Sequence, residues 1–245
     1  MAYYHCLLFD VDGTLLDFNA AEQAALAQVL AYYGFDEKPG ITERYHEINN
    51  ALWAKLERGE IKQDKLVVQR FETLLREFSL EADAAEVNDR YLSFLAGRAD
   101  VYEGAHEILE ELAEVATLAV VTNGVERVQR NRMAQAGLEK YFDGVFVSSK
   151  VGASKPSRKI FEAALKSLGV ENGAKVLMIG DSLKADILGA KNAGLASCWC
   201  NFQHQPVPED MPATHVIEHL DELMRIVMEP EELENVGNPD KRHKV

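Results

Sequence analysis

Residues 6–16 read Cys-Leu-Leu-Phe-Asp-Val-Asp-Gly-Thr-Leu-Leu, and they decide the fold. The first four form an apolar run without charge, which is typical of a strand buried on both faces of a parallel α/β sheet. Ligands of open α/β sheets bind beyond the carboxyl ends of the strands, where Asp10 and Asp12 stand. Gly13 permits a tight turn after them. The stretch therefore predicts a first strand that delivers two carboxylates to a ligand site.

The carboxylates of Asp10 and Asp12 repel each other when both are ionised. At about 5 Å and an effective dielectric constant of about 20, the repulsion costs about 3 kcal/mol. A bound cation, a shared proton or solvent between the groups would relieve it. A polar strand-to-loop turn is the alternative interpretation of Asp-x-Asp alone, so the other strand ends must decide.

The composition describes an acidic chain with a substantial core. Its 245 residues are enough for one large domain or a core with a smaller one, and 47% of them are hydrophobic, which excludes a mainly disordered chain. The net charge of −14 disfavours a nucleic-acid polymer or an anionic membrane as partner. We find no apolar stretch of transmembrane length and no secretory signal at the start.

Three cysteines, Cys6, Cys198 and Cys200, make an odd number in a chain of this size. They are expected to be reduced, buried small hydrophobes, which predicts a cytoplasmic protein. Cys198 and Cys200 share one face of a predicted strand, but no set of Cys and His has the spacing of a zinc site.

The pattern of apolar residues divides the chain into a helical block and an alternating part. Helical spacing predicts four helices, with no strand among them, at 20–33, 42–58, 63–78 and 82–96. Further along, five strands are predicted at 117–121, 144–148, 175–179, 196–200 and 214–217, between helices at 104–113, 125–136, 157–168, 184–193 and 219–228. The predicted fold class is α/β, a doubly wound, mostly parallel sheet with an inserted α-helical unit. We expect a core of residues 1–15 and 98–228, a helical cap of residues 16–97, and a surface tail at 229–245.

Polar groups follow the predicted strands where they end. The groups are Asp10 and Asp12, Thr122 and Asn123, Lys155 in a loop at 148–155, and Asp181 followed by Asp186. Each has an ordinary alternative: a turn, a surface loop or a helix cap. Parallel strands end at one edge of the sheet, so the groups are expected to converge there. Carboxylates suit magnesium, and a hydroxyl, backbone N–H groups and an ammonium suit phosphoryl oxygens, so the set favours phosphoryl transfer.

The order of these groups resembles the four motifs of the haloacid dehalogenase superfamily of phosphohydrolases. The motifs are Asp10-Val-Asp12-Gly-Thr14, Thr122-Asn123-Gly124, Lys155-Pro156, and Gly180-Asp181-Ser182 with Asp186. The resemblance covers the chain except the tail, and it implies a Rossmann-like core with the helical block as the family's cap. Lys155-Pro156 is also a candidate for a cis peptide bond.

The resemblance implies a role for each residue. Asp10 would be the nucleophile that forms an aspartyl-phosphate, and Asp12 would protonate the leaving oxygen and later activate water. Thr122, the Asn123 backbone and Lys155 would hold the transferring phosphoryl group. Mg²⁺ would be bound by the Asp10 carboxylate, the Asp12 backbone carbonyl and Asp181, with support from Asp186.

Asp12 also separates the branches of the superfamily. The dehalogenase and phosphonatase branches lack a carboxylic acid two residues after the nucleophile, so Asp12 favours hydrolysis of a phosphate ester. A phosphomutase would keep Asp12 but typically differs at the position of Thr14.

The substrate is predicted from the cap. The opening residues 9–18, the segment 52–61 and Arg70-Phe71 look similar to bacterial 5′-nucleotidases, including those that act on noncanonical pyrimidine nucleoside monophosphates. Phe18 or Trp53 would stack on a base and Arg70 would contact the substrate. Alternatively, Trp53 is a core residue and Arg70 forms an ion pair on the cap surface.

Two other functions stay open at this point. A sugar-phosphate or phosphoglycolate phosphatase would use the same core with a different cap. A catalytically idle binding or regulatory protein would keep only the fold, although the intact motifs weigh against it. Either a monomer or a dimer is compatible with the sequence.

Overall fold

The computed structural model describes residues 2–170, 175–210 and 213–228. The predicted tail at 229–245 lies outside these residues. None of the described helices is both long and apolar enough to cross a membrane.

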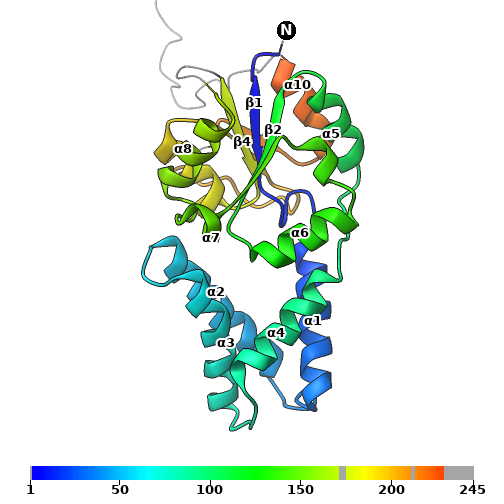
Figure 1. The fold of residues 1–245 in the computed structure, drawn as a ribbon, viewed down its shortest axis with the longest axis vertical. Helices are drawn as coiled ribbons and strands as arrows, with labels where there is room; N and C mark the ends of the chain where they lie inside the picture. The colour runs from blue at the N-terminus through cyan, green and yellow to red at the C-terminus, as the bar shows by residue number, and fades with distance from the viewer. Residues whose placement is uncertain (1, 171–174, 211–212, 229–245) are drawn as a thin grey trace, which may run out of the picture.

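A single sheet forms the centre of the larger part of the molecule (Figure 1). Its strands are β1 (Cys6–Phe9), β2 (Thr117–Thr122), β3 (Gly144–Val147), β4 (Val176–Gly180), β5 (Ala196–Cys200) and β6 (His215–Ile217). They lie in the order β3-β2-β1-β4-β5-β6, and every described pair is parallel. The predicted doubly wound parallel sheet is therefore confirmed, with β1 between β2 and β4.

Helices cover both faces of this sheet, which is why β1 is apolar throughout. The helices are α5 (Ala105–Ala113), α6 (Glu126–Gln135), α7 (Ser148–Val151), α8 (Arg158–Ser167), α9 (Leu188–Ala193) and α10 (Leu223–Met228). Leu7 and Phe9 belong to one apolar cluster, which includes residues of α5 and α10. Cys6 and Leu8 belong to another, which includes residues of α8 and α9. Alternate side chains of a strand point to opposite faces, so a strand covered on both sides needs no polar residue.

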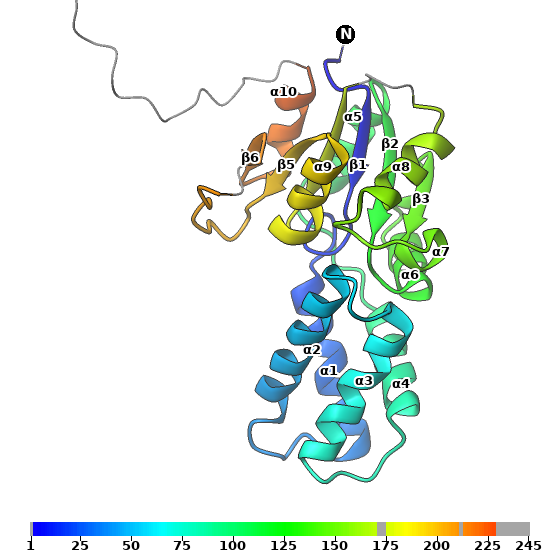
Figure 2. The same cartoon turned by 90° about the vertical axis from the view of Figure 1, so that its left-hand side faces the viewer.

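Four helices inserted between β1 and α5 form a second unit below the carboxyl ends of the strands (Figures 1 and 2). They are α1 (Phe18–Tyr33), α2 (Ile41–Glu57), α3 (Gln63–Glu77) and α4 (Ala84–Ala96). The predicted helical insertion without strands is confirmed for the described residues, and we call it the cap. The boundaries predicted for the domains stay a prediction.

Residues of α1–α4 form a hydrophobic core in the cap, which Val128 of α6 joins. The rings of Tyr45, Phe71 and Tyr91 meet at its centre, with centroids 5.4–5.9 Å apart. At the start of α1 the Asp17 carboxylate accepts a hydrogen bond from the Ala20 N–H at 3.0 Å, which satisfies an otherwise free donor of the first turn. The cap therefore needs no apolar surface of the sheet to bury its helices.

Three of the predicted elements differ from the structure in kind, whereas most of the others differ by one or two residues at their ends. The predicted strand at 144–148 ends at Val147, and residues 148–151 of the expected loop form the single turn α7. The helix predicted at 184–193 begins as a π-turn, Leu183–Ile187. The segment at 219–228 starts as a 3₁₀ turn, Leu220–Glu222, because Glu222 accepts the N–H groups of both Glu218 and His219. Such local bonds do not alter hydrophobic periodicity, so the sequence pattern does not reveal them.

We expect replacement of Phe71 by Ala to destabilise the cap by about 3–5 kcal/mol, because the ring is fully buried and its loss leaves a cavity. Urea unfolding measures this. Tyr32→Ala is the matched control, since Tyr32 is an aromatic residue of the cap that is 57% exposed, and it should cost less than about 1 kcal/mol. Equal losses in the two variants would contradict a separate cap core.

Candidate active site

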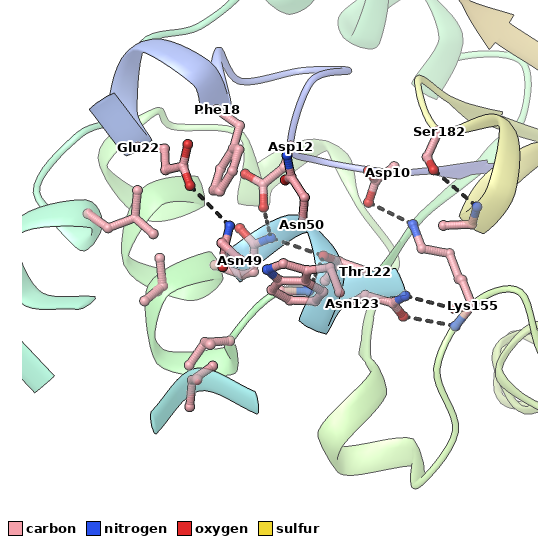
Figure 3. A pocket seen from close by; sticks show the side chains of 18 of the residues that line it. Asp10, Asp12, Phe18, Glu22, Asn49, Asn50, Thr122, Asn123, Lys155 and Ser182 are labelled. Carbon is pink, nitrogen blue, oxygen red and sulfur yellow. Dashed lines mark hydrogen bonds and ion pairs between the residues drawn. The ribbon is translucent and has the colours of Figure 1, made fainter. Parts of the chain in front are cut away.

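Three carboxylates and one ammonium meet at the carboxyl ends of β1 and β4. Asp10, Asp181 and Asp186 each offer an oxygen, and these oxygens lie within 4.8 Å of one another. The Lys155 Nζ lies 2.7 Å from Asp10 Oδ1 and 2.7 Å from Asp186 Oδ1. Figure 3 shows the Lys155 side chain extending toward Asp10. The topology thus brings together groups that are up to 176 positions apart in the sequence.

Burial and like charge determine how these groups titrate. Burial, with the charges of Asp10 and Asp186, raises the pKa of Asp181 well above its ordinary value. Burial raises the pKa of Asp186 to about 6, although Lys155 opposes this change. Burial alone would lower the pKa of Lys155, but the carboxylates of Asp10 and Asp186 outweigh it and raise that pKa. Lys155 is therefore a permanent cation at neutral pH.

The carboxylate group fits a divalent cation. Hard carboxylate oxygens are the ligands that Mg²⁺ prefers, and the Lys155 ammonium pairs with Asp10 and Asp186, two of the three carboxylates. Asp10, Asp181 and Asp186 are the residues that can hold the ion.

Two glycines give the carboxylates room. Gly13 has φ +79°, and a Cβ there would overlap the Asp181 carboxylate. A Cβ on Gly180 would overlap the carboxylate of Asp186. Asp186 comes from the π-turn after β4, and its Oδ2 accepts the Ser182 N–H at 3.0 Å. The π-turn therefore directs Asp186 back toward Lys155, which fits the common occurrence of such turns at functional sites.

Asn123 fixes the backbone of Lys155. Its Nδ2 donates to the Lys155 carbonyl at 2.9 Å, and its Oδ1 accepts the Lys155 N–H at 2.8 Å. The Lys155-Pro156 peptide bond is cis, as predicted. Sequence analysis assigned only the backbone of Asn123 to the site, and the structure adds this function of its side chain.

Thr122 is buried at the end of β2, and its hydroxyl oxygen accepts two hydrogen bonds. The donors are the Gly124 N–H and the Gln129 Nε2, both at 3.0 Å. Gln129 also donates to Asp12 Oδ2 at 2.6 Å, so it links the first two motifs. Sequence analysis missed Gln129, which lies on α6.

Asp12 faces α6 rather than the carboxylate group. Its Oδ1 pairs with the guanidinium of Arg132, a fully buried residue of the same helix. Burial raises the pKa of Asp12, Arg132 opposes this change, and the charge of Asp10 adds to it. The charge of the neighbouring Asp10 is thus a smaller cause than burial.

Arg132 also contacts both segments that connect the cap to the core. Its Nε donates to the Arg98 carbonyl at 2.8 Å, just after α4. Its guanidinium carbon lies 5.8 Å from the centre of the Phe18 ring, at the start of α1. Sequence analysis missed Arg132 because three arginines stand at 127, 130 and 132, and no periodic signal shows which is buried.

A cavity of about 460 Å³ extends from these residues to the cap (Figure 3). All three cap residues named from the sequence, Phe18, Trp53 and Arg70, line it. Trp53 also packs against the cap core. It is therefore a residue of the core and of the cavity wall at the same time, so the two interpretations of Trp53 from the sequence do not exclude each other. Arg70 is 3% exposed, so the alternative of an ion pair on the cap surface is wrong.

The motifs, the fold and the cavity can be compared with known proteins. The model of the haloacid dehalogenase-like hydrolase family matches residues 4–194. The chain belongs to this family. The resemblance stated from the motifs is thereby confirmed.

Three bacterial relatives are similar over most of this chain. The HAD hydrolase YfnB of Bacillus subtilis is 38% identical over 93% of the chain and 97% of YfnB. The pyrimidine 5′-nucleotidase PynA of Streptococcus pneumoniae is 40% identical over 82% of the chain and 86% of PynA. The pyrimidine 5′-nucleotidase YjjG of Escherichia coli is 32% identical over 90% of the chain and 96% of YjjG.

A crystal structure of YfnB bound to magnesium has the same fold. It superposes with a TM-score of 0.83 at 36% identity, covering 91% of this chain and 98% of YfnB. A family member with this architecture therefore binds the ion that the carboxylate group here fits.

We expect Gly13→Ala to weaken binding of Mg²⁺ about tenfold or more, because the new methyl displaces Asp181. Isothermal titration calorimetry measures the affinity. Gly34→Ala is the control: Gly34 has φ +69°, and no atom lies within 4 Å of the position that a methyl would take there, so it carries similar backbone strain away from the carboxylates. Unchanged affinity in Gly13→Ala would exclude a metal site that includes Asp181.

We expect Arg132→Ala to reduce the free energy of unfolding by about 2–5 kcal/mol, because it empties the fully buried site of the guanidinium and leaves the partly buried Asp12 carboxylate without its cation. Arg127→Ala on the same helix breaks only the exposed pair with Asp89 and should cost less than about 1 kcal/mol. Urea denaturation compares them, and similar losses would contradict the special position of Arg132.

Proposed function

We propose that this protein is a Mg²⁺-dependent phosphate monoester hydrolase that acts as a 5′-nucleotidase on pyrimidine nucleoside monophosphates. The observation that carries the proposal is the group of Asp10, Asp181, Asp186 and Lys155 at one end of the cavity. The two relatives named as pyrimidine 5′-nucleotidases support the substrate. Three buried cysteine thiols are consistent with action in the cytoplasm.

Asp10 acts as the nucleophile in this proposal. One of its oxygens attacks phosphorus, the bond from phosphorus to the ester oxygen breaks, and an aspartyl-phosphate forms. A phosphate dianion repels a carboxylate, and Lys155 offsets this because its ammonium already lies 2.7 Å from Asp10. Asp10, Asp181 and Asp186, with the backbone carbonyl of Asp12, would hold a Mg²⁺ ion, which would supply the remaining positive charge.

Asp12 acts as the acid and the base. It gives its proton to the leaving ester oxygen, then takes a proton from the water that attacks phosphorus and releases phosphate and Asp10. Burial favours the protonated form that the first step needs, and Arg132 and Gln129 stabilise the carboxylate that follows. Thr122 and the Asn123 backbone hold the phosphoryl oxygens, and the Asn123 side chain positions Lys155.

We expect phosphate release from UMP and CMP with Mg²⁺, at a kcat/KM at least about tenfold above that for ribose 5-phosphate or phosphoglycolate. A colorimetric phosphate assay measures this release. Asp10→Asn should reduce it by at least about a thousandfold, because it removes the nucleophile, and EDTA should abolish it.

The other outcomes separate the alternatives. Activity that favours a sugar phosphate or phosphoglycolate would keep the mechanism and refute the nucleotidase. Release from none of these esters would favour the idle binding or regulatory protein. Release that survives in Asp10→Asn would refute the covalent mechanism.

A further inference from the structure

A buried polar network forms part of the cap side of the cavity, and the chemistry proposed above does not use it. Glu22, Asn49, Arg70 and Asn88 come from α1, α2, α3 and α4, and each is 3–7% exposed. The first three line the cavity, whereas Asn88 lies behind Arg70. Buried polar groups are costly unless they are paired, so a network that faces a cavity suggests a ligand.

The carboxamide of Asn49 is held in one orientation. Its Nδ2 donates to Glu22 Oε1 at 3.2 Å, and its Oδ1 accepts from Arg70 Nη1 at 3.2 Å (Figure 3 shows the bond to Glu22). A flipped amide would turn its N–H groups toward the guanidinium and its oxygen toward the carboxylate. The neighbours therefore fix which end of the amide donates and which accepts.

Half of the hydrogen-bonding capacity of Asn49 remains for a ligand. An amide has two N–H donors and two acceptor lone pairs, and the bonds to Glu22 and Arg70 use one of each. Asn49 lines the cavity, so a ligand there can reach the remaining donor and acceptor. A carboxamide of this kind pairs with two adjacent groups of a ligand, one acceptor and one donor.

Arg70 is engaged within the cap and is a poor receptor for an anionic substrate tail. Its Nε donates to the Val67 carbonyl at 3.1 Å, and its Nη2 donates to Asn88 Oδ1 at 3.0 Å. Its guanidinium carbon lies 4.5 Å from the centre of the Tyr91 ring. Glu22 also lines this wall, where its carboxylate would repel a second anion. The cap side of the cavity thus favours a neutral group over a second carboxylate or phosphate.

Aromatic side chains complete the wall. Phe18 and Trp53 both line the cavity and are partly buried. Aromatic faces accept a planar ring without regard to its polar edge, so they contribute affinity, and Asn49 contributes selectivity.

We propose that Asn49 is the specificity-determining residue for the base, and that its carboxamide pairs with the adjacent donor and acceptor of a pyrimidine ring. In uracil these are N3–H and O4, and in cytosine they are the exocyclic amine and N3. Glu22 and Arg70 are positioning residues that fix the amide. This inference rests on the proposed function, because it names how that site selects its substrate.

The experiment compares UMP with ribose 5-phosphate, which has the same phosphate and sugar but no base. The readout is the ratio of the two kcat/KM values for the full chain with Mg²⁺. Asn49→Ala should lower this ratio about tenfold or more, mainly by raising KM for UMP. Asn88→Ala is the matched control, since it removes an equally buried amide from the same Arg70 without changing the cavity wall, and it should keep the ratio within about twofold.

A second variant covers the case in which Asn49→Ala does not fold. Glu22→Met keeps a side chain of similar length but removes the oxygen that accepts from the Asn49 amide, and it should lower the ratio about threefold or more. Ratios within twofold of the wild-type value in every folded variant of Asn49 and Glu22 would overturn the inference. Equal losses in Asn49→Ala and Asn88→Ala would also overturn it, because they would indicate a structural effect through Arg70. A wild-type chain that does not prefer UMP or CMP to ribose 5-phosphate would instead refute the nucleotidase itself, before any variant is made.

Discussion

The ammonium of Lys155 holds the site together by lying between Asp10 and Asp186. Like charges collect at the end of the sheet because β1 and β4 are neighbours and each is followed by carboxylates. Without a cation between them these groups could not all be ionised at such short range. Lys155 follows β3, the strand at one edge of the sheet, and not the strands that carry the carboxylates. Asn123, at the end of β2, holds it in place through two hydrogen bonds to the Lys155 backbone. The side chain that balances the charge is thus positioned by a different strand from those that carry it.

The polar groups at the strand ends could be predicted from the sequence, because parallel strands end at the same edge of the sheet. An apolar run that stops at a polar group predicts both the strand and the place of the group, and this rule found Asp10, Thr122 and Asp181. The helices follow no such rule. Gln129 and Arg132 lie on α6, a polar helix in which a buried side chain and an exposed one look alike in the sequence. Only the packing of α6 against the first loop distinguishes them.

The same limit explains why the cap was predicted less fully than the core. Phe18, Trp53 and Arg70 were named from their chemistry, but Asn49 and Glu22 gave no signal, because a polar residue on an amphipathic helix is normally solvated. Four helices must meet before these side chains become a network. Arg70 shows the difference in one residue: its sequence context allows a surface ion pair, whereas the structure surrounds it with amides and aromatic rings.

The two sides of the cavity differ in how their charges are balanced, and this difference fits the proposed division between catalysis on the core side and base selection on the cap side. On the core side the Lys155 ammonium pairs with two of the three carboxylates, so a metal ion would have to offset the remaining negative charge before an anionic phosphoryl group could bind. On the cap side Arg70 is bonded to amides, and the Glu22 carboxylate lines the same wall, so this side offers little positive charge to a second anion. A phosphate ester whose leaving group is neutral fits both sides of the cavity. A substrate with a second anionic group would lose the hydration of that group on the cap side and, among the described residues, find no free cation there to compensate. Arg132 belongs to neither side alone, since it contacts Asp12 together with the start of α1 and the end of α4. The position of the cap and the environment of Asp12 therefore depend on one buried side chain.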